Sequence, residues 1–215
     1  MDERLKGLSV LGSTGSVGTQ VLDIVRTYPD RFTVIGLAAN RNHKLLFEQI
    51  EEFEPRFVYY KKPLEEGIDF PASKARKVNL SEIATADDVD IVVTATTGDV
   101  ALSPTFDAIE KGRDIAIANK ETIIMAGAKL MRDAGNKGVS LLPVDSEPSA
   151  IWQCLRGENS LIEKLVITAS GGAFRDVPIE ELDQVQRTDA LKHPTWEMGA
   201  KISVDSATMM NKAFE

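Results

Sequence analysis

Short apolar runs alternate, over the first 144 residues, with segments in which apolar residues recur every three or four positions. A short run between turn residues predicts a buried strand, and the longer repeat predicts an amphipathic helix. Regular alternation of the two predicts an α/β fold, a mostly parallel sheet with helices on both faces. The predicted strands are 7–11, 32–37, 57–60, 91–95, 115–118 and 139–142, the predicted helices are 17–28, 45–53, 105–111 and 123–134, and 61–81 is predicted to be surface loop and short turns.

The pattern changes after residue 144. Residues 165–168 predict one more strand, a long irregular stretch follows as far as Trp196, and helical spacing resumes over 203–215. Residues 1–144 are therefore predicted to form one domain, and 145–215 the first part of an α+β domain that is incomplete. We expect a piece of a longer protein, because the last helical pattern stops without a capping residue or a polar tail.

Composition and charge narrow the class of protein. Of 215 residues 43% are hydrophobic, and 33 acidic against 25 basic side chains give a net charge of −8. A packed core is expected, and an acidic chain without a basic cluster argues against nucleic acid as a partner. No apolar run is long enough for a membrane span, and the first residues do not read as a signal or transit peptide, so a cytoplasmic protein is expected. One cysteine and two histidines exclude an internal disulfide and a zinc cluster.

A glycine-rich turn joins the first predicted strand to the first predicted helix. Its glycines let the backbone turn sharply and approach a pyrophosphate, which binds at the helix N-terminus. This context predicts a Rossmann-like domain, although the spacing is GxxGxxG, and a tight turn without a ligand is the alternative. The residues of this candidate cofactor site are Gly12, Ser13, Thr14, Gly15, Ser16, Val17 and Gly18.

The end of the second predicted strand bears on the choice of cofactor. Enzymes that use NAD place an acidic residue there for the ribose 2′-hydroxyl, and this chain has none at 37–42. Arg41, flanked by Asn40 and Asn42, offers a cation for the 2′-phosphate of NADP. The alternative is a solvated arginine in a polar loop.

Two carboxylates follow the last strand of the first domain. Asp145 and Glu147 lie two positions apart at a strand's carboxyl end, where ligands of open α/β sheets collect. Oxygen ligands without His or Cys suit Mg²⁺ or Mn²⁺. Capping of the helix that carries Ile151 and Trp152 is an equally good interpretation.

Polar loops after residue 144 supply further candidates. Ser170 is followed by two glycines after a predicted strand, which suits an anion cradle, and the loop of His193 and Trp196 is rigid enough for a lid. Each of these, taken alone, is better explained as a surface polar group. Cys154 falls on the apolar face of its predicted helix and is expected to pack in the core.

Six segments together resemble 1-deoxy-D-xylulose 5-phosphate reductoisomerases of the non-mevalonate isoprenoid pathway. They are LGSTGSVG at 11–18, ANKE at 118–121, LPVDSE at 142–147, ASGG at 169–172, HPTWEMG at 193–199 and KISVDSATMMNK at 201–212. Their order and spacing fit over the whole chain. The chain departs from the family pattern at Pro148 and Ser149, where the family has His-Asn, and family members are considerably longer.

The resemblance implies a role for individual residues. Metal ligands (Mg²⁺ or Mn²⁺) are expected at Asp145, Glu147 and Glu215. Contacts to NADPH are expected from the glycine turn and from Asn40, Arg41, Asn42, Ala95, Asn119 and Glu121. Contacts to the phosphorylated sugar substrate are expected from Lys120, Ser146, Glu147, Ser170, His193, Trp196, Ser206, Asn211 and Lys212. The residues expected to be catalytic are Lys120, Asp145, Glu147 and His193. A mobile flap over the substrate is expected to carry His193, Trp196 and Met198.

The resemblance also implies the reaction and the assembly. The family converts 1-deoxy-D-xylulose 5-phosphate to 2-C-methyl-D-erythritol 4-phosphate by a metal-assisted rearrangement and a hydride transfer from NADPH, and the full-length protein is expected to be a homodimer. Two alternatives are kept. One is an NADP-binding fragment without turnover, and the other is a semialdehyde-type dehydrogenase that uses the thiolate of Cys154.

Overall fold

The computed structural model describes residues 4–61 and 70–215. The chain divides into two compact units, Met1–Asp145 and Ser146–Glu215. The division falls one residue after the domain boundary that the sequence pattern predicts.

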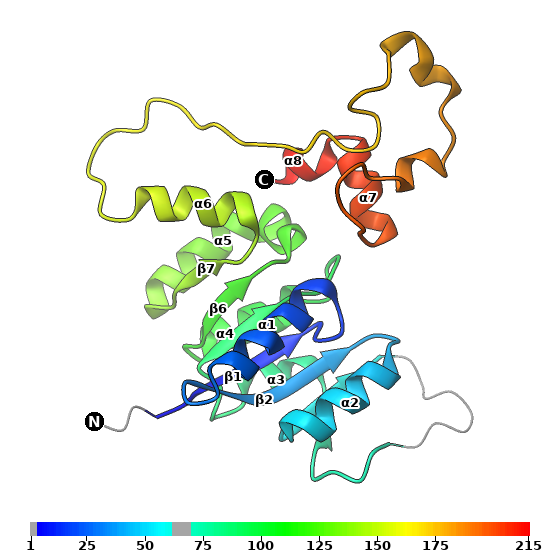
Figure 1. Cartoon of the computed structure of the whole chain (residues 1–215). Coiled ribbons are helices and arrows are strands. Elements are labelled where there is room, and N and C mark those ends of the chain that lie inside the picture. The colour runs from blue at the N-terminus through cyan, green and yellow to red at the C-terminus, as the bar shows by residue number, and fades with distance from the viewer. Residues whose placement is uncertain (1–3, 62–69) are drawn as a thin grey trace. The chain divides into compact units, whose positions relative to one another are not determined.

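A seven-stranded parallel sheet forms the centre of the first unit (Figure 1). Its order is β4-β3-β2-β1-β5-β6-β7, and every neighbouring pair is parallel. The predicted α/β class is confirmed, and each strand predicted before residue 144 is present. The strands are β1 Lys6–Leu11, β2 Phe32–Ala39, β3 Phe57–Tyr60, β4 Arg76–Lys77, β5 Ile91–Thr94, β6 Asp114–Ile117 and β7 Leu141–Pro143.

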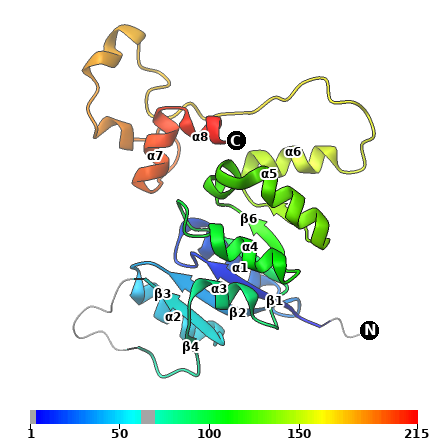
Figure 2. The same ribbon diagram turned by 180° about the vertical axis from the view of Figure 1, so that it is seen from behind.

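Helices cover both faces of this sheet. Figure 1 shows α1 and α2 in front of the strands, and Figure 2 shows α3 and α4 on the opposite face. Strand residues supply the two cores alternately, because successive side chains point to opposite faces. Val10 packs with Leu22 and Leu46 in one core, whereas Leu11 packs with Ile83 in the other. The helices are α1 Ser16–Thr27, α2 His43–Phe53, α3 Leu80–Thr85, α4 Leu102–Glu110 and α5 Lys120–Lys137.

The prediction that residues 61–81 form surface loop and short turns is partly wrong. Arg76 and Lys77 form β4 at the edge of the sheet, and α3 begins at Leu80. The rest of that prediction includes 62–69, which lie outside the described residues. The helix α3 starts with a capping box, in which the side chains of Asn79 and Glu82 bond each other's backbone N–H.

The chain changes direction across the sheet at β1. It builds β2 and β3 on one side of β1 and then returns to place β5, β6 and β7 on the other. The carboxyl ends of β1 and β5 therefore flank a topological switch point, which is where open α/β sheets bind ligands. The glycine turn after β1 and the loop after β5 lie at this point.

The second unit contains helices and irregular chain. Its elements are α6 Ser146–Leu155, the 3₁₀ turns Ile179–Gln184 and Asp189–Leu191, α7 Ala200–Ala207 and α8 Met210–Phe214. The helix expected over 203–215 is therefore two helices, separated at Met209, whose φ is +61°. No strand forms between residues 146 and 215, all of which are described.

Two predictions for the second unit are wrong. Residues 165–168 are not a strand, and Leu165 and Val166 are 60% and 69% exposed. A strand needs a partner for its backbone N–H and C=O groups, and residues 146–215 offer none. Cys154 is exposed instead of packed, because no residue of α6 is buried.

No helix in the described ranges, 4–61 and 70–215, combines the length and the apolar character that a membrane crossing requires.

The packing of α1 gives a stability prediction. Leu22 is fully buried, whereas Ile24 on the same helix is 50% exposed. We expect Leu22→Ala to lower the free energy of unfolding by about 2–5 kcal/mol, because it leaves a cavity between α1 and the sheet. Ile24→Ala is the matched control and should change it by less than about 0.5 kcal/mol. Urea unfolding followed by circular dichroism measures both, and equal losses would contradict this account of the core.

Candidate active site

The glycine turn is held tightly against both neighbouring strands. The N–H groups of Gly12 and Ser13 both donate to the carbonyl of Ala38 at the end of β2, each at 2.9 Å. Gly12 has a φ of +98°, and a Cβ there would lie 2.4 Å from the carbonyl oxygen of Ala95. A side chain at Gly12 would therefore force the turn away from β5. The sequence places glycine where this close approach requires it.

Several N–H donors of this turn have no hydrogen-bond partner in the part of the chain that the structure describes. The N-cap of α1, Gly15, has no side-chain cap, and the first turn of the helix carries no acidic residue. Within the described residues, the N–H groups of Thr14, Ser16 and Val17 donate no hydrogen bond that would occupy them. A helix N-terminus with free N–H groups favours an anion.

Buried hydroxyl groups lie around the same point. Ser13 and Thr94 are fully buried, and their hydroxyl oxygens have no hydrogen-bond partner in the part of the chain that the structure describes. The hydroxyl oxygen of Thr96, a half-buried residue, is also buried and has no hydrogen-bond partner among the described residues. Buried polar atoms without partners are rare in folded proteins, so they mark a place where a bound group completes the structure.

The loop after β2 carries the candidate specificity residues. Asn40, Arg41 and Asn42 are all exposed. The side-chain oxygen of Asn42 accepts from the N–H of Leu45 at 3.2 Å and caps α2. No ion pair of the Arg41 guanidinium is present among the described residues, and no carboxylate lies in this loop. The geometry is compatible with a phosphate contact for Arg41, which stays a prediction.

Asn119 ties the loop after β5 to the start of α5. Its amide nitrogen donates to the carbonyls of Thr96 and Gly98 at 2.7 and 3.0 Å. Its oxygen accepts from the N–H and the hydroxyl of Thr122 at 2.8 and 2.5 Å. An amide offers two donors and two lone pairs, so this side chain is fully used by the protein. The expected contact of Asn119 with a cofactor stays untested, as do those of Ala95 and Glu121.

Lys120 and Asp145 form an ion pair in the first unit. Lys120 is the first residue of α5, after β6, and Asp145 follows the neighbouring strand β7. The ammonium lies 2.7 Å from a carboxylate oxygen, and the two side chains are 18% and 30% exposed. Two predicted site residues are thus brought together by adjacent strand ends.

A second charged cluster lies in the second unit. The ammonium of Lys212 in α8 contacts the carboxylates of Glu147 in α6 and Glu215. The two glutamates each offer an oxygen within 4.8 Å of the other. Asn211 donates to Glu215 at 3.1 Å, and Ser146 donates to Glu147 at 2.6 Å. Five predicted site residues therefore form one hydrogen-bonded group.

Burial and pairing act in opposite directions on this cluster. Burial alone would raise the pKa of Glu147, but hydrogen bonds from Lys212 and Ser146 outweigh it and hold that pKa below its usual value. Burial alone would lower the pKa of Lys212, and its bonds to Glu147 and Glu215 instead raise it. Glu147 and Lys212 are therefore both charged near neutral pH.

Ser170 and His193 also meet. Their side chains are 3.0 Å apart, from Ser170 Oγ to His193 Nε2. The other ring nitrogen, Nδ1, accepts from the backbone N–H groups of Thr195 and Trp196 at 3.1 and 2.9 Å. An accepting Nδ1 carries no proton, so Nε2 carries it and donates to Ser170. His193 is thus a hydrogen-bond donor toward Ser170 and not a base that activates the serine.

The turn after Ser170 packs against α7. Gly172 has a φ of +68°, and a Cβ there would lie 2.3 Å from the carbonyl oxygen of Ser206. This contact brings the candidate segment 169–172 next to Ser206. Trp196, on the expected flap, is 60% exposed.

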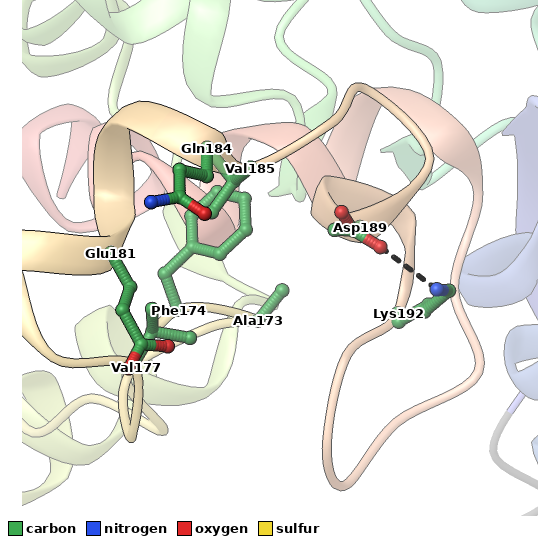
Figure 3. Close-up of a pocket in the computed structure, with 8 residues that line it drawn as sticks. All are labelled: Ala173, Phe174, Val177, Glu181, Gln184, Val185, Asp189 and Lys192. Carbon is green, nitrogen blue, oxygen red and sulfur yellow. Dashed lines mark hydrogen bonds and ion pairs between the residues drawn. The ribbon is translucent and has the colours of Figure 1, made fainter.

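A shallow pocket of about 370 Å³ lies elsewhere in the second unit. Phe174, Val185 and Gln184 gather on one side of it, and the Asp189–Lys192 ion pair lies on the other (Figure 3). None of the predicted site residues lines this pocket, so it carries no part of the candidate site.

Gln49 is a polar residue at the glycine turn that the sequence reasoning missed. It is 2% exposed, and its side-chain nitrogen donates to the carbonyl of Ser13 at 3.0 Å. The signal was present in the sequence, since a glutamine stands in the apolar stripe of α2 between Leu46 and Ile50.

The parallel sheet and the glycine turn at its switch point place the first unit among Rossmann-like α/β proteins. The sequence model described as 1-deoxy-D-xylulose 5-phosphate reductoisomerase matches residues 8–127, and the model of the C-terminal domain of that enzyme matches 141–215. The chain belongs to the 1-deoxy-D-xylulose 5-phosphate reductoisomerase family, as the sequence motifs predict.

Curated relatives of that name match almost the whole chain. The protein of Thermosynechococcus vestitus is 50% identical over 221 residues, which cover 98% of this chain and 54% of the relative. A protein of Clostridium perfringens is 47% identical over 221 residues, which cover 98% and 58%. The chain thus spans about half the length of the curated relatives it matches.

Solved structures agree with this assignment. The crystal structure of a DOX-P reductoisomerase in complex with NADPH, fosmidomycin and magnesium has a TM-score of 0.84 at 36% identity, and covers 98% of this chain and 56% of that chain. The enzyme from Zymomonas mobilis in complex with NADPH gives the same TM-score, identity and coverage. A homoserine dehydrogenase from Thiobacillus denitrificans, 21% identical with a TM-score of 0.50 over 72% of this chain, shares the fold alone.

The charged cluster gives a titration prediction. Lys212→Met should raise the pKa of Glu147, because burial then acts without the compensating ammonium. Carboxyl-carbon NMR measures this directly, and Lys201→Met, which removes the ion pair to Asp205, is the control. In the unsubstituted chain, the depressed Glu147 pKa contributes stability that is complete above about pH 4.5 and is lost as the pH falls. The raised Lys212 pKa contributes stability that is complete below about pH 10.5 and is lost as the pH rises. A Glu147 pKa that is unchanged in Lys212→Met would contradict the role of the pair.

Proposed function

We propose that the whole protein is an NADPH-dependent 1-deoxy-D-xylulose 5-phosphate reductoisomerase, to which this chain contributes the cofactor domain and part of the substrate site. The single observation that carries the proposal is the glycine turn at the switch point. It combines N–H groups at the start of α1 with buried hydroxyls, none of which has a partner among the described residues, as an anionic dinucleotide requires. Membership of the reductoisomerase family supports the choice of reaction.

The cofactor is proposed to bind across the carboxyl ends of β1, β2 and β5. The N–H groups of Thr14, Ser16 and Val17 would hold the pyrophosphate, and Arg41 with its two asparagine neighbours would hold the 2′-phosphate. Asn119 would act here by fixing the loop that contains Thr96 and Gly98. Relatives solved with NADPH support this assignment.

A divalent ion is proposed as a second cofactor. The donor set fits Mg²⁺ or Mn²⁺, because Glu147 and Glu215 bring carboxylate oxygens together and Asp145 is separated from Glu147 by one residue. The two glutamates already share one cation, the ammonium of Lys212, so the ion would take the place of that ammonium beside them. When bound, the ion would act as a Lewis acid on substrate oxygens. The solved relative with magnesium supports this proposal.

The substrate is proposed to be held by its phosphate group. Ser170, Ser206, Asn211 and Lys212 offer hydroxyl, amide and ammonium groups for that anion, and His193 directs its Nε2–H toward the same segment. Such an anchor orients the substrate with binding energy that lies away from the reacting carbons. Lys120 and Ser146 would hold oxygens nearer the reaction, and the flap of Trp196 and Met198 would exclude water.

The proposed chemistry has two stages. The carbon skeleton of 1-deoxy-D-xylulose 5-phosphate rearranges to a branched aldehyde, and hydride from NADPH then reduces that aldehyde to 2-C-methyl-D-erythritol 4-phosphate. Retro-aldol and aldol steps or an α-ketol shift both account for the first stage. The homodimer of the full-length protein and its cytoplasmic location are parts of the same proposal.

A second candidate function is binding of NADP without turnover by these 215 residues. The observation that favours it is coverage, since the chain spans 54% and 58% of the two relatives described above. Calorimetry with NADPH beside a turnover assay separates the two, because binding without product formation assigns only the cofactor function to this chain. The semialdehyde dehydrogenase alternative loses its support, since the family is that of the reductoisomerases.

Cofactor preference provides the first test. Arg41→Ala should weaken NADPH binding by about 1–3 kcal/mol, or roughly 5- to 150-fold, and leave NADH binding almost unchanged, because only NADPH carries the 2′-phosphate. Fluorescence titration of both cofactors measures this. Arg31→Ala, at the opposite end of β2, is the control and should alter neither affinity. Equal affinity of the unsubstituted chain for both cofactors would disprove the assignment.

The metal site provides the second test. Asp145→Asn keeps the size of the side chain but removes its charge, so Mn²⁺ binding followed by electron paramagnetic resonance should weaken at least about tenfold. NADPH binding should be retained, and the same substitution in a full-length relative should abolish turnover. Asp133→Asn, on α5, is the control. Near-normal Mn²⁺ affinity and turnover would favour helix capping as the role of Asp145.

A further inference from the structure

Gln49 makes an unusual contact for a residue of a helix core. Its side chain is almost completely buried, at 2% exposure, among the apolar residues on the inner face of α2. Its nitrogen donates to the carbonyl of Ser13, 36 residues earlier in the chain, at 3.0 Å. Its oxygen is buried and has no hydrogen-bond partner in the described ranges. An unmatched buried oxygen costs stability, so the position is not optimised for packing alone.

The contact fixes the direction of one specific N–H group. The carbonyl of Ser13 and the N–H of Thr14 belong to the same peptide group, which is planar and trans, so the two point in opposite directions. A hydrogen bond from Gln49 to the carbonyl therefore directs the N–H of Thr14 away from α2. The preceding peptide is fixed separately, because the N–H of Ser13 donates to Ala38 at 2.9 Å.

The N–H of Thr14 is one of the donors of the glycine turn that has no partner in the described part of the chain. It lies outside α1, so the geometry of that helix does not determine its direction. The hydrogen bond from the Gln49 side chain determines that direction instead. On the same helix, α2, the N-cap is Asn42, the neighbour of Arg41. The helix α2 therefore begins beside the candidate 2′-phosphate loop and also contains Gln49, whose hydrogen bond holds the glycine turn.

We infer that Gln49 is a positioning residue of the cofactor site, which aims the N–H of Thr14 at the pyrophosphate of NADPH. The inference rests on the proposed function, because it requires that the turn binds a dinucleotide. Gln49 itself is buried beneath the turn and donates its bond to protein, so it acts through Thr14. Loss of the hydrogen bond from Gln49 to Ser13 should weaken binding of the pyrophosphate and leave binding of the adenosine 2′-phosphate part unchanged.

The test compares two ligands on the full 215-residue chain. NADPH carries the pyrophosphate, and adenosine 2′-monophosphate does not. We expect Gln49→Met, which has a similar length and no donor, to weaken NADPH binding about tenfold, the scale of one lost hydrogen bond to an anion site. Binding of adenosine 2′-monophosphate should change less than about twofold. Isothermal calorimetry measures both.

A matched control separates positioning from a general loss of stability. Ile50→Val removes packing from the same buried face of α2 but no hydrogen bond to the turn. It should lower the melting temperature while weakening the two ligands equally or not at all. If Gln49→Met also weakens both ligands equally, Gln49 only supports the helix and the inference is overturned.

An NMR measurement on the unsubstituted chain tests the same inference without the Gln49→Met variant, which could fail to fold. The Thr14 amide signal should shift when NADPH binds and stay in place with adenosine 2′-monophosphate. A Thr14 signal that ignores NADPH overturns the inference while the proposed function stands. Failure of the unsubstituted chain to bind NADPH overturns both. Unchanged NADPH binding by a folded Gln49→Met variant overturns the inference alone.

Discussion

The close approach of three backbone segments at Gly12 is the constraint on which the first unit depends. The turn lies against the carbonyl of Ala38, to which it donates two hydrogen bonds, and against the carbonyl of Ala95, where a Cβ at Gly12 would collide. These contacts join the ends of β2, β1 and β5, three strands that are far apart in the sequence. The start of α1 is thereby fixed at the switch point, so the first N–H groups of the helix, which have no intrahelical partner, lie there.

Much of this sheet could be predicted from the sequence, because its central strands are continuous apolar runs between turn residues. The edge strand β4 could not, since Arg76 and Lys77 are exposed charged residues, and the strand is held by bonds from the N–H groups of Arg76 and Val78 to the carbonyls of Arg56 and Val58. The opposite error arose at 165–168, where an apolar run has no strand beside it. Local pattern reports which residues favour an extended chain, but pairing depends on what lies next to them.

The same distinction explains the outcome for the candidate site. The glycine turn is formed by residues that are adjacent in the sequence, so the seven residues 12–18 were enough to predict it. The pair of Ser170 with His193 and the contact of Gln49 with Ser13 join residues that are 23 and 36 positions apart. Their spacing carries no signal of proximity. Cys154 shows a related limit, because the periodicity of α6 identifies an apolar face but not whether another element covers it.

Gly172 illustrates what the absence of a side chain does in the second unit. The backbone of Ser206 lies where a methyl group on Gly172 would be, so the two segments meet main chain to main chain. The spacing between the loop of Ser170 and the helix of Ser206 is therefore set by peptide geometry, which varies little, and not by rotamers, which vary a good deal. In sequence comparisons a glycine at this position would be expected to tolerate less variation than the polar residues around it, although it has no functional group of its own.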